Sequence, residues 1–199
     1  MDSTAGIRPP DAPAPAPCAG AAEARAEVDA LNARAWEARF SEPQAGVRLA
    51  RQARELAERA GYRGGVAYAL RAQGACEVLL MEHDAAVAHL GEAVEALRAL
   101  GDVAGSASAL NRIGNAHLRR SDIPAALAAL LEALRIQRAA GDRMGESDTL
   151  NFLGTTYYQV GEYPRALEFY RDSMRIKEAL GDGRGLSHCL NNIGNIHGR

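Results

Sequence analysis

The chain has 199 residues, of which 47% are hydrophobic, so it is long enough for one compact domain and apolar enough to bury a core. Its 23 basic and 25 acidic side chains nearly cancel, which argues against the basic surface of a nucleic-acid-binding protein. The sequence has no run of 18 apolar residues, so it predicts no membrane span. Aromatic residues make up only 5% and alanine is abundant, a composition that favours helices.

Residues 1–21 differ in composition from the rest of the chain. Five prolines are interspersed with alanine between positions 9 and 17, a pattern typical of an extended, solvated segment. The segment lacks the continuous apolar stretch of a secretory signal. We therefore predict a disordered tail over residues 1–21 and a folded domain over residues 22–199.

The three cysteines lie far apart and form no CxxC motif. An odd number of cysteines at wide spacing predicts no disulfide framework, which favours a reducing, cytoplasmic location. Cys76 and Cys189 fall among apolar helix residues, so we expect small buried hydrophobic groups there rather than reactive thiols.

A 40-residue repeat organises the folded domain. Four columns recur at this spacing: Gly61, Gly101, Gly141 and Gly181; Gly65, Gly105, Gly145 and Gly185; Leu70, Leu110, Leu150 and Leu190; Gly74, Gly114, Gly154 and Gly194. Agreement of independent columns at one period indicates a repeat architecture. The predicted units are about 22–60, 61–100, 101–140 and 141–180, followed by a partial unit over 181–199.

Each unit reads as two amphipathic helices joined by a short turn. In the third unit, the leucines at 127, 130, 131 and 134 have the i, i+3, i+4, i+7 spacing of one apolar helix face. Pro124 follows the turn at Ser121-Asp122, where the first turn of a helix tolerates proline. Between units, a glycine that can adopt the left-handed conformation precedes a capping aspartate at 102, 142 and 182. Tyr62 takes the place of that aspartate at the first joint.

Glycine in the middle of a helix costs about 1 kcal/mol relative to alanine, so the column at Gly74, Gly114, Gly154 and Gly194 needs a reason. The second helix of the units also carries small residues, at Ala86, Ala126 and Ala166. Small residues on both helices predict that the two backbones pack closely.

These residues carry a resemblance to a known family. The pattern Leu-Asn-x-Ile/Leu-Gly at 110–114, 150–154 and 190–194, followed by Gly161-Glu-Tyr163 and Ala166, resembles the tetratricopeptide repeat, in a 40-residue variant of the usual 34-residue unit. The unit at 22–60 departs most, with Arg34 and Gly46 where the family has glycine and alanine. The resemblance implies an all-α, right-handed superhelical solenoid whose concave groove binds a protein or peptide segment.

The first helix of each unit then lines the groove, and spacings of three and four select its groove face. Asparagine is a mediocre helix former, so its recurrence there suggests another role, and its amide can pair with the backbone of an extended peptide. In families that this chain resembles, equivalent asparagines hold peptide ligands. The predicted groove residues are Asn111, Asn115, Asn151, Asn191, Asn195, Arg119, Tyr158 and Arg71. A solvated polar face, or asparagines that bond to the neighbouring helix, are the alternatives.

Catalysis is poorly supported by the sequence. The five histidines have no metal-binding spacing, and no serine, cysteine and histidine stand in an arrangement that pairs a nucleophile with a base. We therefore predict a protein that is not an enzyme and has neither metal nor cofactor.

Residue 199 falls before the second helix of the last unit, so Ile193 and Gly194 are expected to present an unpaired surface. The main hypothesis is a binding scaffold that forms the N-terminal sensory or regulatory part of a larger bacterial signalling protein. The alternative is self-association, as a homodimer, through the unpaired C-terminal helix and without a separate peptide ligand.

Overall fold

The structure is a computed structural model that describes residues 19–198. Nine α-helices make up this part of the chain, with no strand among them: α1 (Ala19–Ala38), α2 (Pro43–Arg59), α3 (Arg63–Leu79), α4 (His83–Ala99), α5 (Val103–Arg119), α6 (Ile123–Ala140), α7 (Arg143–Gln159), α8 (Tyr163–Leu180) and α9 (Gly183–His197). The predicted tail lies outside the described residues up to position 18. Helix α1 begins three residues before the predicted boundary at 22.

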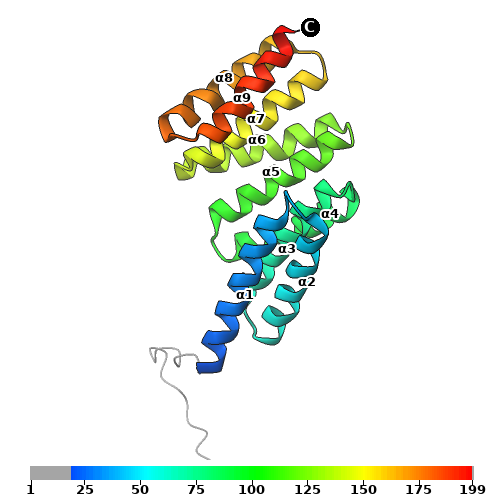
Figure 1. Cartoon of the computed structure of the whole chain (residues 1–199), viewed down its shortest axis with the longest axis vertical. Helices are drawn as coiled ribbons and strands as arrows, with labels where there is room; N and C mark the ends of the chain where they lie inside the picture. Colours follow the sequence, from blue (N-terminus) through cyan, green and yellow to red (C-terminus); the bar gives the residue numbers. More distant parts are fainter. Residues whose placement is uncertain (1–18, 199) are drawn as a thin grey trace, which may run out of the picture.

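The helices form four antiparallel hairpins that stack along one axis, with α9 against the last of them (Figure 1). Each helix packs against its neighbours in sequence, and the odd-numbered helices also contact one another from α1 to α9. The backbones of the even-numbered helices, within residues 19–198, do not approach one another in this way, and ion pairs such as Arg98–Glu132 join their surfaces instead. The odd-numbered helices therefore form the inner layer of a helical-repeat solenoid, as the 40-residue period predicts.

The joints between hairpins have the predicted chemistry. Gly141 ends α6 with φ 69°, in the left-handed conformation that glycine adopts without steric cost. The Asp142 side chain then accepts a hydrogen bond of 2.9 Å from the Gly145 amide and caps α7. Asp102 and Asp182 cap α5 and α9 in the same way. At the first joint, Tyr62 makes no side-chain capping bond, as expected from the missing aspartate.

Close contacts between the two helices of a unit explain the mid-helix glycines. A Cβ atom added at Gly74, Gly114 or Gly154 would lie 2.6 Å from a buried side chain of the following helix, namely Leu90, Leu130 and Tyr170 respectively. At Gly194 no atom lies within 4 Å of that position, because α9 has no following helix among the described residues. We call the contacts of Gly74, Gly114 and Gly154 with the following helix the repeat seam.

Leucine and alanine side chains bury the core along the whole stack. Leu90, Leu97 and Leu130 are fully buried, and many core positions between them are alanines, which lets the hairpins approach closely. Cys76 and Cys189 are buried, as predicted. Burial raises the pKa of the Cys76 thiol to about 11, which keeps the thiol protonated at neutral pH.

Candidate functional site

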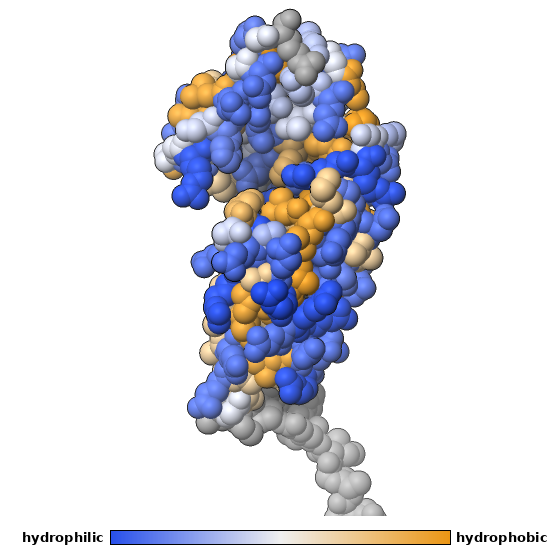
Figure 2. Space-filling view, turned by 45° about the vertical axis from the view of Figure 1, so that its right-hand side comes forward, coloured by the Kyte–Doolittle hydropathy of each residue, from blue (hydrophilic) through white to orange (hydrophobic). Residues whose placement is uncertain are grey.

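A groove of about 460 Å³ crosses the inner layer and is the candidate site. Its lining comes from the end of α1, from α3, α5 and α7, and from the junction of α8 with α9. The lining residues are Arg39, Phe40, Ala75, Val78, Leu79, Arg112, Asn115, Arg119, Asp148, Asn151, Phe152, Lys177, Asp182, Arg184, Gly185 and His188. On the face drawn in Figure 2, the molecule is indented below its C-terminal hairpins, and hydrophobic residues lie among hydrophilic ones there.

The groove carries a local excess of positive charge. Five of its lining residues are arginine or lysine and two are aspartate, whereas the whole chain has a formal net charge of −2. Arg39, Arg112 and Arg184 contribute to this excess and were not among the groove residues that the sequence predicted. An electropositive, partly apolar groove attracts negatively charged ligands and strengthens their interactions near its walls.

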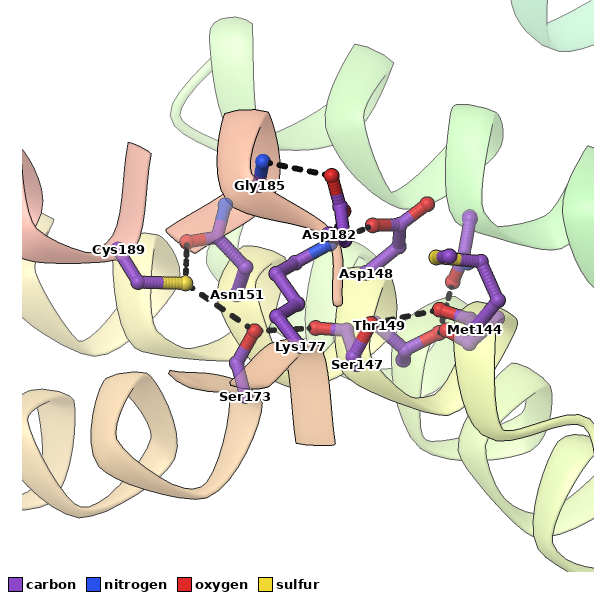
Figure 3. A network of polar contacts seen from close by, with 12 residues as sticks. Met144, Ser147, Asp148, Thr149, Asn151, Ser173, Lys177, Asp182, Gly185 and Cys189 are labelled. Carbon is purple, nitrogen blue, oxygen red and sulfur yellow. Dashed lines mark hydrogen bonds and ion pairs between the residues drawn. The ribbon is translucent and has the colours of Figure 1, made fainter. Parts of the chain in front are cut away.

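Lys177 organises the C-terminal end of the groove (Figure 3). Its ammonium group donates to Asp148 of α7 at 2.8 Å and to Asp182 of the α9 cap at 3.2 Å. Burial alone would lower the pKa of Lys177, but the hydrogen bonds and charges of the two carboxylates outweigh it and leave that pKa raised. The Gly185 amide and Lys177 together lower the pKa of Asp182. Charge-assisted bonds thus fix α7, α8 and α9 to one another.

Trp36 and three arginines lie toward the other end of the groove. The guanidinium carbons of Arg39, Arg71 and Arg112 lie 4.0, 4.4 and 5.6 Å from the centre of the indole ring. Arg39 and Arg112 line the groove, and Arg71 lines an adjacent hollow of about 270 Å³ together with Trp36 and Tyr68. Burial and the neighbouring arginines lower the pKa of Arg39 to about 10.

The structure places three of the predicted site residues in the groove. Asn115, Asn151 and Arg119 lie in its lining, on α5 and α7. Arg71 lies beside Trp36 in the adjacent hollow. Tyr158 packs against Tyr163 across the α7–α8 hairpin, with ring centres 5.6 Å apart, and is not in the described lining. Asn191 and Asn195 are exposed on α9, likewise outside that lining.

Asn111 differs from the prediction, because it is turned into the contact between two inner helices. Its side chain is only 4% exposed and accepts a hydrogen bond of 2.7 Å from Thr149 of α7. Asn151 accepts a bond of 3.0 Å from Asn192 of α9, although it also reaches the groove. At positions 111 and 151 the recurring asparagine therefore connects successive inner helices, which is an alternative that the sequence left open.

Sequence reasoning missed Trp36, Arg39, Arg112 and Phe152. They occupy positions that differ from one repeat to the next: the column of Arg112 reads Asn32, Ala72, Arg112, Phe152 and Asn192. A search for recurring residues passes over such a column. No sequence pattern marks these four residues, because the columns of the repeat in which they stand also contain small and polar side chains.

Within residues 19–198, no histidine, cysteine, aspartate and glutamate side chains are grouped so that three or more could hold a metal ion. None of the helices in this described part of the chain has the length and apolar character needed to cross a membrane.

Comparisons with known proteins identify the repeat. The family described as "Tetratricopeptide repeat" matches residues 105–179. No curated protein matches the chain by sequence. Among solved structures, aspartyl phosphate phosphatase F from Bacillus subtilis superposes with a TM-score of 0.73 at 16% identity, over 85% of this chain and 44% of that protein.

Two other solved structures have the same fold at 16% identity. BtubC (BKLC) from P. vanneervenii superposes with a TM-score of 0.63 over 89% of this chain and 81% of that protein. The third structure is the Signal Transduction ATPase with Numerous Domains (STAND) protein with a tetratricopeptide repeat sensor from Pyrococcus horikoshii. It superposes with a TM-score of 0.65 over 85% of this chain and 27% of that protein. The chain thus spans less than half of the phosphatase and about a quarter of the STAND protein.

Proposed function

Because residues 105–179 match the tetratricopeptide-repeat family and the fold is a helical-repeat solenoid, we propose that the chain is a protein-interaction scaffold whose groove binds an extended segment of another protein. The observation that carries the proposal is the groove across the inner layer, which takes lining residues from the turn after α1 and from the odd-numbered helices α3, α5, α7 and α9. A continuous groove over several repeats fits a ligand that is itself elongated.

The lining has the chemistry that peptide binding needs. Phe40, Leu79 and Phe152 offer apolar surface on which partner side chains can be buried. The amide of Asn115 has a donor and an acceptor, and that of Asn151, whose oxygen accepts from Asn192, has N–H donors, and these groups can pair with the main chain of an extended segment. Apolar contacts with a few oriented polar groups are the usual composition of a binding groove.

We also propose that the scaffold is the sensory or regulatory part of a larger bacterial signalling protein in the cytoplasm. The likeness in fold to a STAND protein whose tetratricopeptide repeat is a sensor supports this role. The proposal assigns the chain no catalytic step of its own. Affinity capture with the intact parent protein, followed by mass spectrometry of the bound proteins, tests it, and failure to recover a signalling component would contradict it.

The groove assignment is tested by selecting peptides from a random library displayed on phage. We expect the chain to enrich a set of related peptides, and the Asn115→Ala/Asn151→Ala variant to bind them at least about tenfold more weakly, as expected for two lost hydrogen bonds. Gln52→Ala, at an exposed position of α2, is the matched control and should bind normally. Circular dichroism should show equal helicity for all three proteins. Failure to enrich any peptide, or unchanged affinity in the double variant, would contradict the proposal.

Self-association through α9 is a second candidate, favoured by one observation. Leu190 is 53% exposed, and the space beside Gly194 is open in the described chain. An apolar patch of this kind can bind a second copy. Light scattering over a dilution series tests this candidate: a concentration-dependent dimer that Leu190→Glu abolishes supports it, and a monomer at every concentration contradicts it.

A further inference from the structure

Three arginines surround one aromatic ring at the N-terminal end of the groove, and we call Arg39, Arg71 and Arg112 with Trp36 the arginine cluster. All three guanidinium carbons lie within 5.6 Å of the centre of the indole. Arg39 also lies over Phe40 at 4.2 Å, and Arg112 over Phe152 at 5.6 Å. The cluster joins α1, α3 and α5, and through Arg112 it reaches Phe152 of α7.

The positive charge of the cluster is not neutralised by an ion pair. No carboxylate of residues 19–198 lies within 4.0 Å of these guanidinium groups. Asp148 and Asp102 act on the cluster electrostatically, but both are engaged elsewhere. Asp148 accepts from Lys177 at 2.8 Å, and Asp102 accepts from Tyr68 at 2.5 Å and caps α5.

Stacking leaves the hydrogen-bonding edge of an arginine available. An aromatic ring covers the face of the planar guanidinium, while its N–H groups point outward in the plane and match the two oxygens of a carboxylate. Arg39 donates from Nη1 to the Trp36 carbonyl. The Nε atoms of Arg39, Arg71 and Arg112 are buried without a hydrogen-bond partner. Buried N–H donors without partners are costly, so the cluster does not serve the stability of the free protein.

The positive charges of the three arginines also repel one another. Burial, followed by repulsion from Arg112, lowers the pKa of Arg39, and burial with repulsion from Arg71 lowers the pKa of Arg112. Burial likewise lowers the pKa of Arg71. A negative charge placed beside the cluster would favour the protonated form of all three, because opposite charges attract more strongly in a partly buried site.

We propose that the arginine cluster selects acidic protein segments, with aspartate or glutamate carboxylates of the partner bound to the N–H edges of Arg39 and Arg112. Arg71 stacks on Trp36 and adds its charge from the adjacent hollow. The exposed Arg119, farther along the groove, can take a further carboxylate. This inference rests on the proposed function, since it specifies which segments the groove accepts.

Trp36 is the only tryptophan of the chain, so its fluorescence reports directly on the cluster. We expect hexaglutamate to change the Trp36 emission in a saturable way and hexaglutamine to have no such effect. Added salt should weaken hexaglutamate binding, because partly exposed charges are screened. Binding of hexaglutamine as tight as that of hexaglutamate, or no response to hexaglutamate, would overturn the inference.

Matched variants separate the cluster from the general charge of the protein. Arg39→Gln and Arg112→Gln should each weaken hexaglutamate binding by about tenfold or more, the usual loss for a charge-assisted bond. Arg135→Gln, at an exposed position of α6, removes the same charge and should bind normally. Equal weakening in all three variants would overturn the inference. Tighter binding of single-stranded oligothymidylate than of hexaglutamate would also overturn it.

The phage-selected peptides distinguish this inference from the proposed function. Enrichment of acidic peptides that Arg112→Gln no longer binds supports both. Enrichment of neutral or basic peptides that the Asn115→Ala/Asn151→Ala variant no longer binds leaves the proposed function standing and overturns the acidic selection. Failure to enrich any peptide contradicts the proposed function itself.

Discussion

The repeat seam and the groove are built from different kinds of sequence position. At the seam, a glycine meets a leucine or tyrosine in three successive hairpins, and the residues recur every 40 positions. In the groove, recurring residues such as Asn151 stand beside positions that change from repeat to repeat, and Arg112 has alanine and phenylalanine as its nearest counterparts. Contacts that must be made in every hairpin require the same residues, whereas a ligand requires a different side chain at each point along its length.

The two regions also differ in energetics. The seam is tightly packed and apolar, so it contributes to stability. The arginine cluster holds three partly buried cations close together, which opposes stability in the free protein. Sites that violate the rules of stable packing are commonly functional. Substitutions should therefore reduce stability at the seam and reduce binding in the groove.

The largest expected effect comes from adding one methyl group to the seam. In Gly114→Ala, the new Cβ would lie 2.6 Å from Cγ of the buried Leu130, so we expect the free energy of unfolding to fall by about 1–3 kcal/mol, the usual cost of overpacking. Gly194→Ala is the matched control, because that position faces open space. It should gain up to about 1 kcal/mol from helix propensity. Urea denaturation measures both, and equal effects would contradict the seam assignment.

The next largest effect concerns the joint between α8 and α9. Asp182→Ala removes the cap of α9 and one partner of Lys177, and should lower the free energy of unfolding by about 0.5–2 kcal/mol. Because the pKa of Asp182 is lower in the folded protein, its contribution is present above the unfolded value of 3.8 and is lost as pH falls through the folded value. The difference in Tm between wild type and variant should therefore be large at neutral pH and vanish in acid. A difference that persists below this range would contradict the role of the carboxylate.

The sequence predicts the repeat seam better than the groove, because the residues of the seam recur in three successive hairpins. Gly114, Asp142 and Pro124 stand at fixed positions of the repeat. They predicted a close contact between helices, a helix cap and a helix start respectively, and the structure confirms all three. The recurrence of Asn111 was interpreted as a ligand contact, whereas its side chain bonds to Thr149 in the next inner helix. Recurrence by itself does not distinguish a contact between repeats from a contact with a ligand.

The arginine cluster was beyond sequence reasoning for a physical reason. Trp36, Arg71 and Arg112 belong to three different repeats, and their meeting depends on how far each hairpin is rotated against the next. That rotation results from many small packing contacts, none of which has a residue signature of its own. The period therefore predicts which helices line the groove but not which of their side chains meet.

A smaller effect, of opposite sign, is expected in the groove. Arg112→Met keeps much of the side-chain volume but removes a buried charge with no ion-pair partner among the described residues, so the free energy of unfolding should rise by up to about 1 kcal/mol. Thermal denaturation measures the change. The same variant should lose hexaglutamate binding. A marked fall in Tm would show that Arg112 serves mainly to hold α5 against Trp36 and Phe152.

The smallest expected effect lies in the turn within the second hairpin, which belongs neither to the repeat seam nor to the groove. Met81 has φ 65°, at the position where the fourth hairpin has Gly161 with φ 80°. A side chain in the left-handed region costs about 1–2 kcal/mol, while glycine loses about 0.5–1 kcal/mol more backbone entropy on folding. Met81→Gly should therefore raise the free energy of unfolding by about 0.5 kcal/mol and leave peptide binding unchanged, whereas Gly161→Met should lower it. Stability changes of the same sign in these two variants would mean that the turn conformation differs between the hairpins.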